Sequence, residues 1–160
     1  MAVKRILVPV DFSEDSLNAL RYARDFAKPL GAQLVILYVI EPIYYATPSD
    51  MYVSSPNIGM LMEEQRRIGK EQLQRLAADL KKKGQRFRAV IKCGAPAQVV
   101  ADTAKSLKAD MIVMGTHGRT GIAHVLMGSV AEKVVRHAPC PVLTVRHGAI
   151  KSRQRGGRKK

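Results

Sequence analysis

Three glycines and a serine in the C-terminal half of the chain could bind an anion: Gly115, Gly118, Gly128 and Ser129. They follow the apolar run at residues 111–114, which is typical of a buried strand, and a helical pattern begins just after them. Glycines let the backbone approach a ligand closely, and a helix N-terminus offers unpaired N–H groups and a partial positive charge. This stretch therefore predicts the binding of phosphate, and with it of a nucleotide, between a strand and a helix.

Catalysis has no comparable signal in the sequence. The stretch lacks the P-loop spacing G-x4-G-K-[ST], since no lysine lies between Gly115 and Ser129. His117 and His124 have no partnered nucleophile, so a surface or packing role is favoured over acid–base chemistry. No other residue stands out as a general base, and we expect slow or no hydrolysis of a bound nucleotide, without catalytic residues.

The composition is that of one globular domain. The chain has 160 residues, 46% of them hydrophobic, and no apolar run approaches the roughly 20 residues of a membrane helix. The N-terminus lacks the pattern of a secretory signal, so a cytoplasmic location is expected. The two cysteines lie in different segments and form no disulfide framework or metal-ligand set; each is expected to be a small buried or half-buried hydrophobe.

The net charge of +14 is unevenly spread along the chain. Six of the 27 basic residues lie in residues 151–160, where there is no acidic residue, and 21 basic against 13 acidic residues remain elsewhere. We expect a domain over residues 1–148 and a disordered basic tail over residues 149–160. A solubilising tail is the favoured interpretation; contact with nucleic acid through counterion release is the alternative.

Five apolar runs of strand length alternate with four helical patterns. Strands are expected over residues 5–10, 33–40, 87–92, 110–114 and 142–145, and helices over residues 14–28, 58–83, 97–107 and 131–137. Residues 41–57 contain three prolines and no periodic pattern, which predicts a long irregular loop. This alternation predicts an α/β fold with a parallel sheet and helices on both faces.

In such sheets ligands bind at the carboxyl ends of the strands, where the strand order reverses. If the first and fourth strands are neighbours there, residues 9–11 lie beside residues 115–118, with Val39 close to both. The resulting cleft has apolar walls, an acidic residue at one end and a glycine loop at the other. This arrangement suits an adenosine with its phosphates.

Three stretches resemble the universal stress protein family, and the resemblance extends over residues 6–145. They read ILVPVDFS at residues 6–13, MGTHG at residues 114–118 and HAPCPV at residues 137–142. The ATP-binding branch of that family has the motif G-x2-G-x9-G-[S/T], which the four residues named first fit. The resemblance implies a three-layer, Rossmann-like fold of the adenine nucleotide alpha hydrolase type, with a five-stranded parallel sheet in the order 3-2-1-4-5.

The resemblance also implies an ATP site, with ADP or AMP as alternative ligands. The residues that it implies are Pro9, Val10 and Val39 around the base; Asp11 at the ribose or adenine; Met114, Gly115, Gly118 and Arg119 around the ribose and phosphates, with His117 in the same loop; and Gly128, Ser129 and Val130 at the β- and γ-phosphates. Mg²⁺ or Mn²⁺ would be held through the phosphate oxygens, because the chain shows no metal-ligand cluster of its own.

Other interpretations of these residues stay open. Asp11 or Ser13 can cap the first helix, and Ser129 with Glu132 has the capping-box spacing S-x-x-E. The glycines can serve a tight turn only, and Arg119 can be a solvated loop residue.

The function expected from these patterns is that of an ATP-binding, nucleotide-dependent stress-response or signalling protein. A slow ATPase and a nucleic-acid-associated stress protein acting through the basic tail are the alternatives. A homodimer is also expected, because residues 141–145 form an exposed apolar edge strand, and members of the family commonly pair through it.

Overall fold

A computed structural model describes residues 2–42, 56–118 and 127–146. Its elements are β1 (Arg5–Val10), α1 (Glu14–Leu30), β2 (Gln33–Ile40), α2 (Pro56–Lys82), β3 (Phe87–Cys93), α3 (Pro96–Ser106), β4 (Met111–Gly115), α4 (Ser129–His137) and β5 (Val142–Val145). The expected alternation is confirmed, with bounds shifted by one or two residues at most ends. The last turn of α1 continues past Pro29, because Gly31 adopts the left-handed conformation (φ 62°) and ends the helix there.

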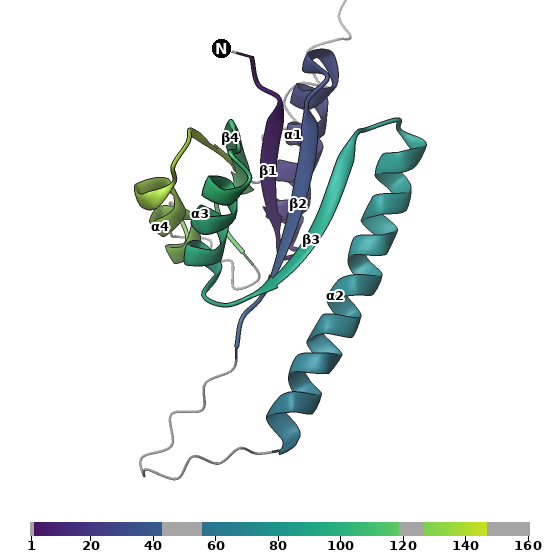
Figure 1. Ribbon diagram of the computed structural model, residues 1–160, viewed down its shortest axis with the longest axis vertical. Coiled ribbons are helices and arrows are strands. Elements are labelled where there is room, and N and C mark those ends of the chain that lie inside the picture. The colour runs from purple at the N-terminus through teal and green to yellow at the C-terminus, as the bar shows by residue number, and fades with distance from the viewer. Residues whose placement is uncertain (1, 43–55, 119–126, 147–160) are drawn as a thin grey trace, which may run out of the picture.

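All five strands are parallel, in the order β3-β2-β1-β4-β5, so the predicted order is confirmed (Figure 1). Strand β1 lies between β2 and β4: Val10 is opposite Tyr38, and Ile6 is opposite Met111. The chain moves outward from β1 through β2 to β3 and then crosses back to β4. The carboxyl ends of β1 and β4 are therefore the switch point of this sheet.

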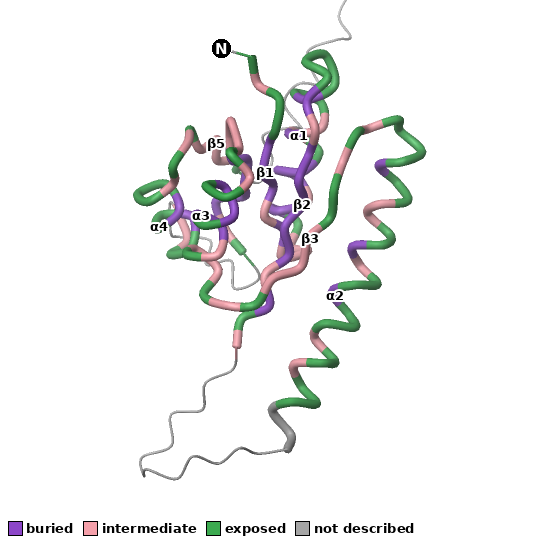
Figure 2. Tube along the Cα trace, in the orientation of Figure 1, coloured by how far each residue is buried: buried purple, intermediate pink, exposed green. Residues whose placement is uncertain are grey.

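Helices cover both faces of the sheet, which gives the predicted three layers. Alternate residues of β1 divide between two cores: Ile6, Val8 and Val10 pack with α1 and α2, whereas Leu7 packs with α3 and α4. The buried residues run along β1 and β2 in the centre of the molecule (Figure 2). None of the described helices combines the length and the apolar character needed to cross a bilayer.

The two cysteines differ in their surroundings. Cys140 is half-buried beside the core under α3 and α4, where burial raises the pKa of its thiol, and the prediction of a small hydrophobe is confirmed for it. Cys93 is exposed, so the same prediction is wrong there. It is the last residue of β3, an edge strand of the sheet.

Asp110 joins the starts of the two strands that flank the switch point. Its Oδ2 accepts hydrogen bonds of 2.8 Å from the backbone N–H groups of Lys4 and Arg5, and these bonds hold the pKa of the carboxyl below its usual value. A carboxylate that gains partners on folding stabilises the fold above its unfolded pKa, about 3.9, and this stabilisation is lost as the pH falls through the lower folded pKa.

We therefore expect Asp110→Asn to lower the free energy of unfolding by about 1 kcal/mol at pH 7, because solvent weakens hydrogen bonds to a charged group at an exposed site. Urea denaturation of both proteins at several pH values measures this difference. It should shrink toward zero as the solution is acidified below pH 4. A difference that stays constant down to pH 2.5 would contradict the role of the charge.

Candidate functional site

A cavity of about 520 Å³ opens at the carboxyl ends of β1, β2 and β4. Its size is that of a small-molecule site. The predicted site residues that line it are Pro9, Val10, Asp11, Val39, Met114, Gly115, His117, Gly118, Gly128, Ser129 and Val130. Arg119 lies outside the described residues. The structure thus brings residues at the ends of β1 and β2 together with residues between β4 and α4, as the switch-point argument predicts.

The turn after β1 presents Asp11 to the cavity. Asp11 Oδ1 accepts a 3.0 Å hydrogen bond from the Ser13 N–H, and Ser13 Oγ in turn accepts from the Ser16 N–H at 3.3 Å. Ser13 is therefore the N-cap of α1, and Asp11 supports this cap. The second carboxylate oxygen lies beside Gly118, so capping support and a place in the cavity are compatible.

Phe12 follows Asp11 with a φ of 65°, a left-handed conformation that is unfavourable for a side chain of this size. Such a conformation costs roughly 1–3 kcal/mol and is concentrated at functional sites. Its ring lies 5.0 Å from the ring of Tyr38, centroid to centroid, so packing against β2 holds the turn in place. The strained turn fixes where Asp11 leaves the sheet.

A side chain at each of the three motif glycines would meet a different neighbour. None of them has a positive φ, so a tight turn alone does not explain them. A Cβ on Gly115 would lie 2.9 Å from the carbonyl carbon of Asp15, and one on Gly118 would lie 2.7 Å from Asp11 Oδ2. A Cβ on Gly128 would lie 3.3 Å from the carbonyl oxygen of Thr116. Gly115 is therefore needed for the packing of β4 against α1.

Helix α4 points its N-terminus at the cavity. Its N-cap is Gly128, which makes no side-chain capping bond, so the capping-box interpretation of Ser129 is wrong: Ser129 is already the first helical residue. Helix geometry leaves the N–H groups of Ser129, Val130 and Ala131 without a partner inside the helix. All three residues line the cavity, and their N–H groups and the helix dipole favour an anion there.

His117 ties the glycine loop to the first turn of α1. Its Nδ1 lies 3.0 Å from Thr116 Oγ1 and 3.5 Å from Oδ2 of the buried Asp15. These contacts fit the packing role favoured for His117, although the residue also lines the cavity. Within the described ranges, no group of three or more His, Cys, Asp or Glu residues could hold a metal ion.

Several lining residues are absent from the sequence prediction: Ser16, Leu37, Tyr38, Glu41, Gln65, Pro96, Val100, Thr116 and Ala131. Most of them are direct neighbours of predicted residues or lie on the same strand ends. Gln65 is different, because it comes from α2. Its sequence signal is a polar residue on the inward stripe of α2, between Met62 and Gly69, where the pattern of the helix requires small or apolar residues.

Comparisons with known proteins agree with this geometry. The model of the universal stress protein family matches residues 2–146. Universal stress protein MJ0531 of Methanocaldococcus jannaschii is 35% identical over 146 residues, which cover 89% of this chain and 82% of the relative.

Two solved structures show the same fold. Universal stress protein UspA from Lactobacillus plantarum has a TM-score of 0.82 and 29% identity, with 91% of this chain and 99% of that one covered. A universal stress protein in complex with cAMP has a TM-score of 0.61 and 27% identity, with 91% and 98% covered. The family match extends over nearly the whole described chain, and this protein therefore belongs to the universal stress protein family.

Proposed function

We propose that this protein binds ATP, with ADP or AMP as competing ligands, in the cavity at the switch point and acts as a nucleotide-dependent stress-response protein. The observation that carries the proposal is the N-terminus of α4, which has no side-chain cap and opens into a cavity that Pro9, Val10 and Val39 also line. A similar structure in complex with cAMP supports an adenine nucleotide as the ligand class.

The nucleotide would lie across the ends of three strands. Pro9, Val10 and Val39 line the cavity at the ends of β1 and β2, which suits the base, and Asp11 lies beside Gly118. The triphosphate would lie along Met114, Gly115, His117, Gly118, Gly128, Ser129 and Val130, with Arg119 beside it. The α4 N–H groups would hold the β- and γ-phosphates, and Mg²⁺ or Mn²⁺ would be bound through phosphate oxygens.

This arrangement favours binding over turnover. Among the described residues that line the cavity there is no lysine or arginine, and Arg119 would be the one such side chain that the stretch between Gly115 and Ser129 supplies. Fast phosphoryl transfer needs such cations on the γ-phosphate and a group that positions the attacking water. We therefore assign no catalytic residue, and the bound nucleotide itself would be the signal.

Mass spectrometry of the native, unboiled protein should detect a co-purified adenine nucleotide. Calorimetry with ATP and ADP then gives dissociation constants, and a nucleotide at a hundred times its dissociation constant should stabilise the fold by about 2.7 kcal/mol. The proposal would be contradicted if no nucleotide co-purified and millimolar ATP caused no shift in melting temperature. Repeated turnover, seen as phosphate release that exceeds the protein concentration, would replace it with an ATPase.

The proposed assembly is a homodimer that pairs through residues 141–145. β5 is an edge strand, and its first three residues are half-buried in the monomer. An exposed apolar edge favours pairing with a second copy. A monomer in sedimentation at micromolar concentration would count against it.

A further inference from the structure

Strand β3 is an edge of the sheet and pairs with β2 along its whole length. In a parallel pair, every second residue points both of its backbone groups at the neighbouring strand. The Arg86 carbonyl accepts a 2.9 Å hydrogen bond from the Leu34 N–H. At the other end of β3, the Gly94 N–H donates to the Ile40 carbonyl at 3.0 Å. The residues of β3 that point toward β2 are therefore the even-numbered ones.

The odd-numbered residues of β3 point their N–H and C=O groups away from the sheet. They are Phe87, Ala89, Ile91 and Cys93. Within the described ranges, these backbone groups have no hydrogen-bonding partner. Ala89 and Cys93 are exposed, and the other two residues are half-buried, so this edge is open to solvent. An open edge of seven residues is long enough to accept a further strand.

The side chains beside this edge alternate between the two faces of the sheet. Phe87 and Ile91 pack against the core under α1 and α2, whereas Val90 packs against the core under α3 and α4. Arg88 and Lys92 share the face of Val90, and Arg88 is exposed. An added strand would therefore lie beside a cation, an apolar side chain and a second cation on this face.

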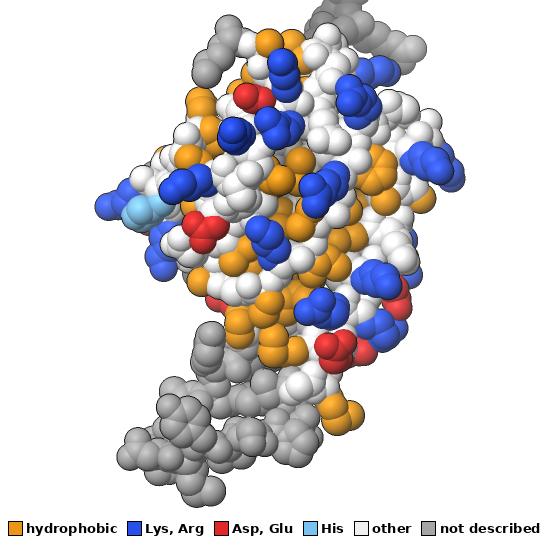
Figure 3. All heavy atoms as spheres, viewed as in Figure 1, with side chains coloured by type: hydrophobic (Ala, Val, Ile, Leu, Met, Phe, Trp, Pro, Cys, Tyr) orange, Lys and Arg blue, Asp and Glu red, His pale blue; other side chains and the backbone are white. Residues whose placement is uncertain are grey.

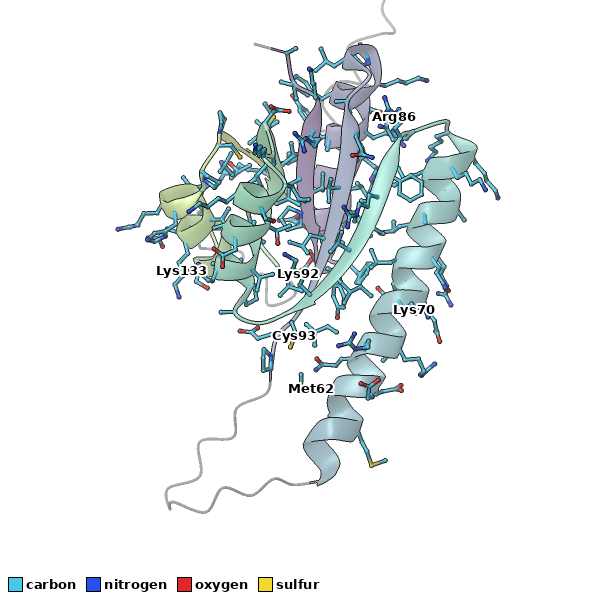
Figure 4. The ribbon with its side chains drawn as sticks, viewed as in Figure 1. Met62, Lys70, Arg86, Lys92, Cys93 and Lys133 are labelled. Carbon is cyan, nitrogen blue, oxygen red and sulfur yellow. The ribbon has the colours of Figure 1, made fainter. Side chains whose placement is uncertain are left out.

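The cations along β3 lack carboxylate partners. Residues 80–101 contain six Lys or Arg residues and no Asp or Glu. Within the part of the chain that the structure describes, no ion pair joins Arg86, Arg88 or Lys92 to a carboxylate, whereas Arg67 on α2 is paired twice along its own helix. Lys and Arg side chains surround a band of hydrophobic side chains on this face (Figure 3). Figure 4 shows Arg86 near the start of β3 and Lys92 near its end.

These features favour an acidic polypeptide over two other occupants of the edge. Two β3 strands of separate copies would bring Arg88 and Lys92 of one copy beside the same cations of the other, and like charges opposite each other destabilise a strand pair. Bound nucleic acid stacks its bases on exposed aromatic rings. The one aromatic side chain of β3, Phe87, instead packs against the core. An acidic strand would satisfy both the open backbone groups and the unpaired cations.

We propose that the β3 edge binds an extended acidic segment of a partner protein by strand addition. The backbone of that segment pairs with the outward N–H and C=O groups of Ala89 and Ile91. Its residues i, i+2 and i+4 are acidic, apolar and acidic, and they lie beside Arg88, Val90 and Lys92. No residue of β3 lines the cavity, so this surface is separate from the proposed nucleotide site.

The probe is the fluorescein-labelled peptide Ser-Glu-Thr-Val-Thr-Glu-Ser, in which both glutamates and the valine share one face of a strand. Fluorescence anisotropy should show that it binds the full chain, and more weakly as salt screens the charges. Ala89→Pro should weaken binding about tenfold or more. Proline removes an outward N–H and places its ring on the edge, while the hydrogen bonds to β2 remain. Ala89→Ser, which keeps the N–H, is the matched control and should bind the peptide like the wild-type protein.

The charges are tested separately by Arg88→Glu and Lys92→Glu. Each should weaken binding of this peptide about tenfold and strengthen binding of a peptide with lysines in place of the glutamates. Lys133→Glu makes the same change of charge at an exposed position on α4, away from β3 (Figure 4), and should have little effect. If Ala89→Pro does not fold, as its melting temperature would show, these charge variants still decide.

Three results would overturn the proposal. The first is no binding of the peptide by the wild-type chain. The second is binding that a folded Ala89→Pro variant leaves intact, since the backbone edge would then not be used. The third is tighter binding of oligothymidylate than of the peptide, which would assign the cations of β3 to nucleic acid.

Discussion

Gly128→Asp should abolish ATP binding without unfolding the protein. Gly128 is the N-cap of α4 with extended dihedral angles (φ −69°, ψ 155°), a conformation that aspartate adopts readily at this position. Its carboxylate would accept from the α4 N–H groups that the phosphates otherwise need, and its charge would repel them. A unit charge about 4 Å away costs roughly 4 kcal/mol at an effective dielectric constant of 20, so a loss of more than a hundredfold in affinity is expected.

The stability of this variant should change little. Aspartate is a better N-cap than glycine by a few tenths of a kcal/mol, and the 3.3 Å contact of the new Cβ with the Thr116 carbonyl oxygen offsets that gain. Calorimetry for affinity and urea denaturation without nucleotide separate the two effects.

Gly128→Asn is the control for charge. Asparagine caps the helix equally well but is neutral, so phosphate can displace it, and the loss in affinity should be about tenfold or less. If both variants bind ATP like the wild-type protein, the phosphates do not lie at the α4 N-terminus.

The alternation of parallel strands and helices could be predicted from local patterns, whereas the strand order, and with it the place of the cavity, was implied by the resemblance to the universal stress protein family. The buried runs of β1 and β2 are apolar at nearly every position, which is typical of parallel strands covered on both faces. Alternating strands and helices then leave few topologies, and the switch point follows from the order. The residues at the strand ends, such as Asp11 and Gly115, are therefore brought together as expected.

The reasons behind individual residues could not be predicted, since they depend on contacts between segments far apart in the chain. Gly115 is a glycine because Asp15, at the start of α1, packs against it. The spacing of Ser129 and Glu132 is typical of a capping box, which requires Ser129 at the N-cap. The N-cap is instead Gly128, and Ser129 is already the first helical residue. Gln65 belongs to a helix with two further glutamines, of which Gln72 is half-buried and Gln74 exposed, and the approach of Gly69 to Tyr38 brings Gln65 to the cavity wall.

Alanine at Gly115 should mainly lower stability and alanine at Gly118 should mainly lower ATP affinity, although both glycines belong to one motif. At Gly115 the new Cβ would meet the backbone of Asp15 at 2.9 Å, and a backbone inside packed layers cannot move aside cheaply. Overpacking of this kind costs about 1–3 kcal/mol, and a loss of 2 kcal/mol corresponds to a decrease in Tm of about 4–8 °C for a chain of this size. This loss should appear in urea or thermal unfolding without any nucleotide.

At Gly118 the new Cβ would instead meet the carboxylate of Asp11, which can rotate away. The rotation breaks its hydrogen bond to the Ser13 N–H, so stability should fall by only about 0.5–1 kcal/mol. It also moves the carboxylate away from its place in the cavity, and ATP affinity should fall about tenfold, as calorimetry would show. Gly118→Ala with unchanged ATP affinity would exclude Asp11 as a ligand contact. If Gly115→Ala leaves stability unchanged, Gly115 is not needed for the packing of β4 against α1, and its remaining role is to let a ligand approach the backbone. If Gly115→Ala mainly lowers stability and Gly118→Ala mainly lowers ATP affinity, then Gly115 is required for the fold and Gly118 for the binding site.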